Sequence, residues 1–136
     1  MNSTRARLLL VDDQEAVRET TAALLADDFE VVCAADGNGA LELLAKQPFD
    51  IVCADYNMPG MTGAELLRLA QVVRPCAAVL VTGHSDYVNS IPQQMREGIA
   101  VVLKPYEPQM LIDTAQRAYM LLRVRGMAQA QRKPLA

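Results

Sequence analysis

The chain has few aromatic residues and almost no histidine. Only 4% of its 136 residues are aromatic, none is tryptophan, and His84 is the single histidine. Segments that bind nucleic acid directly usually combine a basic surface with aromatic side chains, whereas the net charge here is -3. The composition therefore argues against direct nucleic-acid binding by this segment.

Long apolar runs are also missing. No stretch approaches the roughly 18 apolar residues of a membrane span. Near the amino terminus, two arginines precede only four apolar residues, and Asp12 and Asp13 end that run. This is too short for the apolar region of a signal peptide. We therefore expect a cytoplasmic protein that does not bind membranes.

The cysteines are few, odd in number and widely spaced. They stand at positions 33, 53 and 76, without the C-x-x-C spacing of metal sites. Cys33 and Cys53 lie within the apolar runs VVCAA and IVCAD, where cysteine behaves as a small hydrophobic residue. We expect buried free thiols with no chemical role.

Short apolar runs alternate five times with helical patterns. We expect strands at 6–11, 30–35, 49–54, 77–81 and 100–103, and helices at about 14–26, 40–46, 63–74, 86–97 and 107–125. This alternation predicts an α/β protein with a parallel sheet covered on both faces. The fold class is a flavodoxin-like, doubly wound, five-stranded sheet of order 2-1-3-4-5, with five helices in three αβα layers. The domain should occupy residues 1–125, followed by a tail or the start of a linker at 126–136.

Polar side chains follow four of the five expected strands. They are Asp12 and Asp13, Asp55, Thr82, and Lys104 with Pro105. Any one of these could be an ordinary solvated loop residue, but parallel strands bring their carboxyl ends to one edge. Three carboxylates there repel one another unless a cation lies among them. Mg²⁺ prefers such oxygen ligands, and it keeps coordination positions that phosphate oxygens can occupy. An aspartate can attack phosphorus, while an ammonium and a hydroxyl offset the charge on a phosphoryl group.

At this point the sequence resembles the receiver domains of bacterial two-component response regulators, those similar to the chemotaxis regulator. The similarity covers residues 6 to about 125. The matching segments are LLLVDDQ (8–14), DGNGALELL (36–44), FDIVCADYNMPGMTGAELL (49–67), VLVTGHSD (79–86) and LKPY (103–106).

The resemblance implies a role for each matching position. Asp55 would be the phosphoacceptor. Asp13, Asp55 and the backbone carbonyl of Asn57 would bind Mg²⁺ directly, with Asp12 acting mainly through water, and Mn²⁺ could replace Mg²⁺. The phosphoryl group would be bound by Thr82, Gly83 and Lys104, and the Lys104–Pro105 peptide bond would be cis. Pro59 and Gly63 would shape the loop after Asp55 and begin the third helix.

Three features depart from the family pattern. Val101 occupies a position where the family usually has an aromatic switch residue, so we hypothesise that the output change uses the loop after Thr82 and the fourth helix. Pro92 falls inside that helix, which could therefore begin near Ser90 or kink at the proline. His84 could be a phosphodonor or a general base, or it could simply border the pocket. With Asn57 it is a candidate for tuning phosphate lifetime.

The resemblance implies a signalling switch rather than an enzyme with a separate substrate. A histidine kinase or a histidine phosphotransfer protein would phosphorylate Asp55. The modified domain would then act on a downstream protein or a fused output domain. A phosphorylation-dependent dimer is compatible with this scheme. A phosphohydrolase is one alternative, but no second carboxylate closely follows Asp55 to serve as a base. A receiver-like interaction module that works without phosphorylation is the other.

Overall fold

The computed structural model describes residues 5–83 and 98–131 of the chain. It contains five strands: β1 (Arg7–Val11), β2 (Glu30–Ala34), β3 (Ile51–Asp55), β4 (Ala77–Thr82) and β5 (Ile99–Leu103). Four helices lie within the described ranges: α1 (Glu15–Leu25), α2 (Gly37–Lys46), α3 (Gly63–Val73) and α6 (Pro108–Gln131). The fourth helix expected from the sequence, with Pro92, lies outside these ranges.

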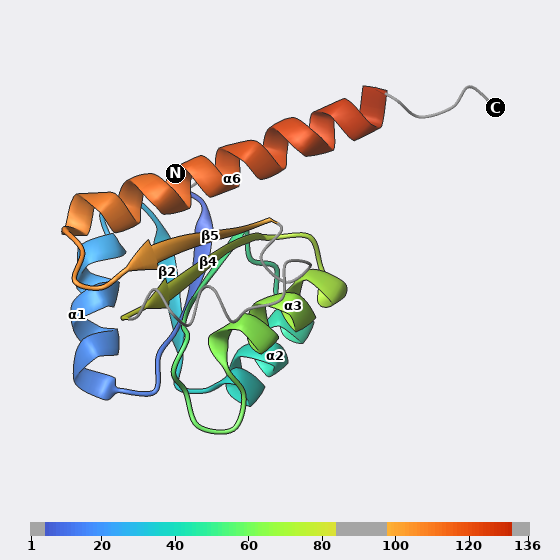
Figure 1. Ribbon diagram of the computed structural model, residues 1–136. Helices are drawn as coiled ribbons and strands as arrows, with labels where there is room; N and C mark the ends of the chain where they lie inside the picture. Colours follow the sequence, from blue (N-terminus) through green and yellow to red (C-terminus); the bar gives the residue numbers. More distant parts are fainter. Residues whose placement is uncertain (1–4, 84–97, 132–136) are drawn as a thin grey trace.

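All five strands are parallel and lie in the order β2-β1-β3-β4-β5. Helices α1 and α6 cover one face and α2 and α3 the other (Figure 1). The expected flavodoxin-like, three-layer architecture is therefore confirmed. Within the described part of the chain, no helix is long and apolar enough to cross a lipid bilayer.

Side chains alternate between two apolar cores because successive residues of a strand face opposite sides of the sheet. Leu9 and Val11 pack toward α2 and α3, whereas Leu8 and Leu10 pack toward α1 and α6. The central strands β3 and β4 are buried almost throughout, as their unbroken apolar runs indicated. The sheet is thus a rigid platform whose carboxyl edge carries the polar residues described below.

Two expectations from the sequence were wrong. Cys33 is exposed, while Cys53 and Cys76 are buried free thiols, because β2 is an edge strand of the sheet with only one residue buried. Helix α6 continues to Gln131 instead of ending near residue 125, and its last turns extend past the sheet (Figure 1). The segment after Gly126 is MAQAQ, which consists of good helix formers, so the helix continues although the apolar pattern has ended.

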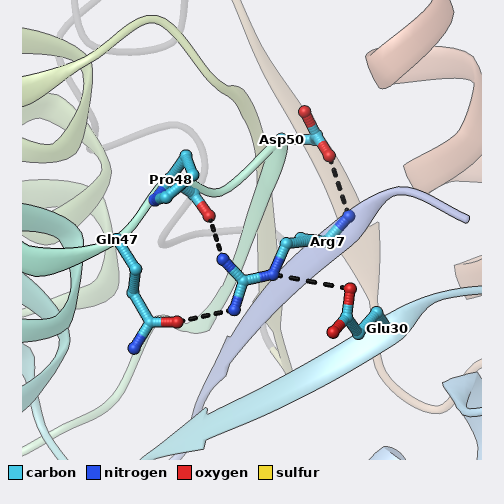
Figure 2. A network of polar contacts seen from close by, with 5 residues as sticks. All are labelled: Arg7, Glu30, Gln47, Pro48 and Asp50. Carbon is cyan, nitrogen blue, oxygen red and sulfur yellow. Dashed lines mark hydrogen bonds and ion pairs between the residues drawn. The ribbon is translucent and has the colours of Figure 1, made fainter. Parts of the chain in front are cut away.

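At the amino edge of the sheet, Arg7 is the centre of a polar network (Figure 2). Its amide donates to Asp50 Oδ2 over 2.8 Å, and its guanidinium donates to Pro48 O over 2.7 Å and to Gln47 Oε1 over 2.6 Å. Its Nε also lies 3.5 Å from Glu30 Oε2. The network fixes the turn before β3 to the start of β1 and to the edge strand β2.

Candidate functional site

The strand register aligns the polar residues at the carboxyl edge. Val11 of β1 pairs with Ala54 of β3, so the next residue of each strand, Asp12 and Asp55, lies at the same height. Both face the α1 and α6 side, because the alternation that buries Leu10 and Cys53 there continues to them. The register alone therefore brings two carboxylates together.

Asp13 completes an acidic cluster with these two residues. One carboxylate oxygen of each of Asp12, Asp13 and Asp55 lies within 4.8 Å of the others. Asp12 is 7% exposed, Asp55 is largely buried and Asp13 is exposed. The cluster thus opens to solvent at Asp13 and is closed below Asp12, as a binding site for a small cation at a protein surface requires.

Burial raises the pKa of the Asp12 carboxyl above its ordinary value. The hydrogen bond from the Gln14 amide to Asp12 Oδ1, 3.0 Å long, opposes this shift, and the negative charge of Asp55 adds to it. A positive charge nearby, that of Lys104, is too weak to cancel the effect of burial. Burial and the neighbouring carboxylate therefore disfavour the ionised form of Asp12.

Lys104 forms an ion pair with Asp55. Its Nζ lies 2.7 Å from Asp55 Oδ1, and the Asp55 side chain is only 12% exposed, so water screens this pair weakly. Burial by itself lowers the pKa of the Lys104 ammonium, but the hydrogen bond and charge of Asp55, with Asp12, outweigh burial and raise it. Lys104 is therefore firmly protonated at neutral pH.

Backbone geometry positions Lys104 and the residues beside it. The Lys104 amide donates to Thr82 O over 2.8 Å, and the Lys104–Pro105 peptide bond is cis. Thr82 ends β4 and is 1% exposed. Among the described residues, a Cβ at Gly83 would meet no atom within 4 Å, so these residues leave open space beside it.

Gly63 allows α3 to begin directly against the end of β3. Its amide donates to Tyr56 O over 2.9 Å. A Cβ at this position would clash with the carbonyl oxygen of Asp55 and would lie 2.8 Å from the Asp55 carbonyl carbon. The absence of a side chain at Gly63 is thus what lets α3 begin against the backbone at the end of β3.

The remaining candidates are Asn57, Val101 and His84. Asn57 is exposed in the loop after Asp55. Val101 is partly buried and packs in the core that faces α2 and α3, on the opposite face of the sheet from Asp12 and Asp55. His84 falls outside the described ranges, so its role stays a prediction.

Two further residues lie at the site and were not singled out in the sequence. Tyr106 lines a cavity of about 20 Å³ together with Asp12, Asp55 and Lys104; its place two residues after Lys104 was the available clue. Arg18 of α1 donates from Nη1 to the backbone carbonyl of Asp12 over 2.8 Å. No residue pattern reveals that contact, because its acceptor is a main-chain atom.

This fold and this edge define a flavodoxin-like α/β protein with an acidic site and a paired lysine at the carboxyl ends of its strands. The family model described as the response regulator receiver domain matches residues 8–116. The chain belongs to this family, and it is therefore a receiver domain of the two-component type.

Relatives and solved structures agree with this assignment. The chain is 37% identical over 114 residues to the response regulator protein FleR of Pseudomonas aeruginosa, covering 82% of this chain and 24% of that protein. It is 32% identical over 134 residues to the transcriptional regulatory protein AruR of the same species, covering 94% of this chain and 54% of that one. The chain thus spans between about a quarter and about half of the length of these relatives.

Among solved structures, a response regulator receiver domain protein from Clostridium thermocellum superposes with a TM-score of 0.78 at 28% identity, covering 88% of this chain and 98% of that one. A receiver domain protein similar to the chemotaxis regulator, from Methanospirillum hungatei, gives a TM-score of 0.79 at 28% identity, covering 90% and 99%. The fold of the family therefore accounts for nearly the whole described chain.

Proposed function

We propose that this domain is a phosphoacceptor of a two-component phosphorelay, in which Asp55 receives a phosphoryl group from a phosphohistidine. The carboxylate oxygen of Asp55 would form the new bond to phosphorus as the bond from phosphorus to the donor imidazole nitrogen breaks, and the imidazole leaves with the bonding electron pair. The observation that carries the proposal is the Asp55–Lys104 ion pair, which lies beside two further carboxylates, those of Asp12 and Asp13. A purely structural ion pair does not require two further acids beside it.

The residues at this edge fit a divalent cation. The cluster offers only carboxylate oxygens, the ligands preferred by Mg²⁺. Mg²⁺ binds its ligands at about 2.0–2.1 Å, so directly bound oxygens lie at most about 4.2 Å apart. A cluster extending to 4.8 Å is compatible with two direct carboxylates, Asp13 and Asp55, and with Asp12 acting through a water molecule.

When bound, Mg²⁺ or Mn²⁺ would neutralise charge on the phosphoryl oxygens. The protein supplies the rest. Lys104 would exchange part of its contact with Asp55 for a phosphoryl oxygen, the Thr82 hydroxyl would donate a hydrogen bond, and the open space beside Gly83 would admit the group. The exposed backbone around Asn57 would offer its carbonyl to the metal.

Signalling, not turnover of a separate substrate, follows from this chemistry. We infer that the donor is a histidine kinase or a histidine phosphotransfer protein, and that the phosphorylated domain changes its affinity for a downstream protein or a fused output domain. The names of the relatives support this, since FleR and AruR are regulators of which this chain matches only part. Dimerisation on phosphorylation would be one form of this output.

The test is intact-mass spectrometry after incubation with a small phosphodonor and Mg²⁺. The native chain should gain the mass of one phosphoryl group, and the Asp55→Asn variant should gain none. Asp27→Asn is the matched control, because Asp27 is an exposed aspartate outside the cluster, and it should be modified like the native chain. Equal labelling of Asp55→Asn and the native chain would refute the assignment. So would a native chain that stays unmodified, which would favour an interaction module independent of phosphorylation.

A further inference from the structure

We propose that Arg18 is a positioning residue for the acidic site: it fixes the backbone of Asp12 and so sets the geometry in which the carboxylates receive a cation. This inference rests on the proposed function and extends it to a residue of α1. Arg18 would not touch the metal or the phosphoryl group. It would act through the main chain of Asp12.

Three contacts hold Asp12 from three directions. Its amide donates to Ala34 O of β2 over 3.2 Å, its carbonyl accepts from Arg18 Nη1 over 2.8 Å, and its Oδ1 accepts from the Gln14 amide over 3.0 Å. The first two fix the peptide planes on either side of the Cα atom, and the third fixes the rotation of the side chain. The position of the carboxylate is therefore determined by the strand on one side and by α1 on the other.

The Arg18 side chain supplies a hydrogen-bond donor to the backbone carbonyl of Asp12. Asp12 is the residue after β1 and is 7% exposed, so its carbonyl lies beyond the sheet ladder in a place that water reaches poorly. A buried carbonyl without a donor is unfavourable. The long, planar guanidinium reaches it from the first turns of α1 with a charge-assisted hydrogen bond.

A positioning role of Arg18 can be distinguished from an effect of its charge, because the two predict opposite changes in Mg²⁺ affinity when the side chain is removed. The charges that shift the Asp12 pKa are those of Asp55, Lys104 and Asp13, whereas the contact of Arg18 is with the Asp12 carbonyl. If the guanidinium acted mainly through its charge, it would repel a divalent cation, and its removal would strengthen Mg²⁺ binding. If it positions Asp12, its removal should weaken Mg²⁺ binding instead.

The experiment is calorimetric titration of the chain with MgCl₂, with the free energy of unfolding measured in parallel. Arg18→Ala should bind Mg²⁺ about 5- to 10-fold more weakly, because a charge-assisted hydrogen bond is worth about 10-fold or more and only part of that is transmitted to the geometry of the carboxylate. Arg18→Lys keeps the positive charge and a hydrogen-bond donor but loses the planar guanidinium group. Its affinity for Mg²⁺ should therefore lie between those of the native chain and Arg18→Ala. The matched control is Glu19→Ala, a change of the neighbouring exposed charge on the same helix, which should alter the affinity less than 2-fold.

Unchanged or tighter Mg²⁺ binding by folded Arg18→Ala would overturn the role of Arg18 while leaving the proposed function intact. If Arg18→Ala does not fold, Arg18→Lys decides alone: weaker binding than in the native chain supports the proposal, and equal or tighter binding overturns it. A native chain that binds no Mg²⁺ would refute both this inference and the proposed function.

Discussion

At the amino edge of the sheet, the Arg7 guanidinium is held by two oxygen acceptors and lies near the carboxylate of Glu30. At the carboxyl edge, the Lys104 ammonium pairs with Asp55, but the same cluster holds two more carboxylates. The charges of the first edge are matched by permanent protein partners. Those of the second are not: three carboxylates share one ammonium, and burial, with the charge of Asp55, raises the pKa of the Asp12 carboxyl.

This difference separates a part of the molecule that serves stability from one that serves function. Matched hydrogen bonds lower the free energy of the folded state, whereas unmatched like charges raise it until a ligand arrives. Changes at the amino edge should therefore alter unfolding and leave phosphorylation unchanged. Changes among the charged residues of the carboxyl edge should alter phosphorylation without lowering the unfolding free energy.

Lys104→Met should have the largest effect. It removes the positive charge that Asp55 contacts at 2.7 Å, and loss of one such electrostatic contact slows a reaction by about 100-fold or more. The measurement is the initial rate of Mg²⁺-dependent phosphorylation from a small donor. Lys46→Met, at the exposed end of α2, should react at the native rate. A Lys104→Met rate within a few-fold of the native one would show that the two edges do not differ as described.

Arg7→Ala is the corresponding change at the amino edge. It removes the side-chain hydrogen bonds to Pro48 and Gln47 and the stacking of the guanidinium on the Phe49 ring, 4.8 Å from its centroid. We expect a loss of about 2–3 kcal/mol of unfolding free energy in urea, with the extent of phosphorylation of the folded protein unchanged.

Glu30→Gln provides the control for that experiment. The Arg7–Glu30 pair is 3.5 Å long and the Glu30 side chain is half exposed, so its loss should change stability by less than about 0.5 kcal/mol. If Glu30→Gln were as destabilising as Arg7→Ala, the ion pair would dominate the network rather than the hydrogen bonds.

Gly63→Ala tests the packing that supports the carboxyl edge. The new methyl group would clash with the backbone of Asp55 and lie 3.0 Å from Leu80 Cδ1, so α3 must shift. Overpacking of this kind costs about 1–3 kcal/mol, measurable by urea unfolding. Gly126→Ala is the contrasting control, because no atom of the described residues lies within 4 Å of a methyl group at that position in α6, and alanine should stabilise the helix by up to about 1 kcal/mol. Equal stability of Gly63→Ala and the native chain would show that the approach of α3 to β3 is not tight.

Much of the carboxyl edge could be predicted from the sequence, for reasons visible in particular residues, whereas the Arg7 network at the amino edge was not predicted. The unbroken apolar runs ending in Asp12 and Asp55 indicated buried parallel strands, and parallel strands must bring their carboxyl ends together. The exposure of Cys33 was missed because its apolar neighbours favour burial, although the expected strand order already placed β2 at the edge of the sheet, where α1 and α2 leave a side chain uncovered. The Arg18 contact was equally hidden, since its partner is a backbone carbonyl.

Asp12→Asn should have a small effect on stability, of unusual sign. In the absence of divalent cations the variant removes one of three clustered negative charges while keeping an oxygen for the Gln14 amide. We expect the unfolding free energy to rise by about 1 kcal/mol near neutral pH. Asp27→Asn, which changes an exposed acid outside the cluster, should change it by less than about 0.5 kcal/mol.

The pH dependence gives a second measurement of the same effect. Because burial raises the pKa of folded Asp12 above its ordinary value of 3.8, the folded chain binds a proton more readily than the unfolded chain between the two values. Protonation of Asp12 therefore contributes to the unfolding free energy below pH 3.8, and this contribution is lost as the pH rises through the raised pKa of the folded state. Asp12→Asn should lack this component, and in millimolar Mg²⁺ the native chain should recover the lost stability because only its folded state has the complete site. An Asp12→Asn variant that is less stable than the native chain without Mg²⁺ would mean that the carboxylates at this edge are already compensated, as those at the amino edge are.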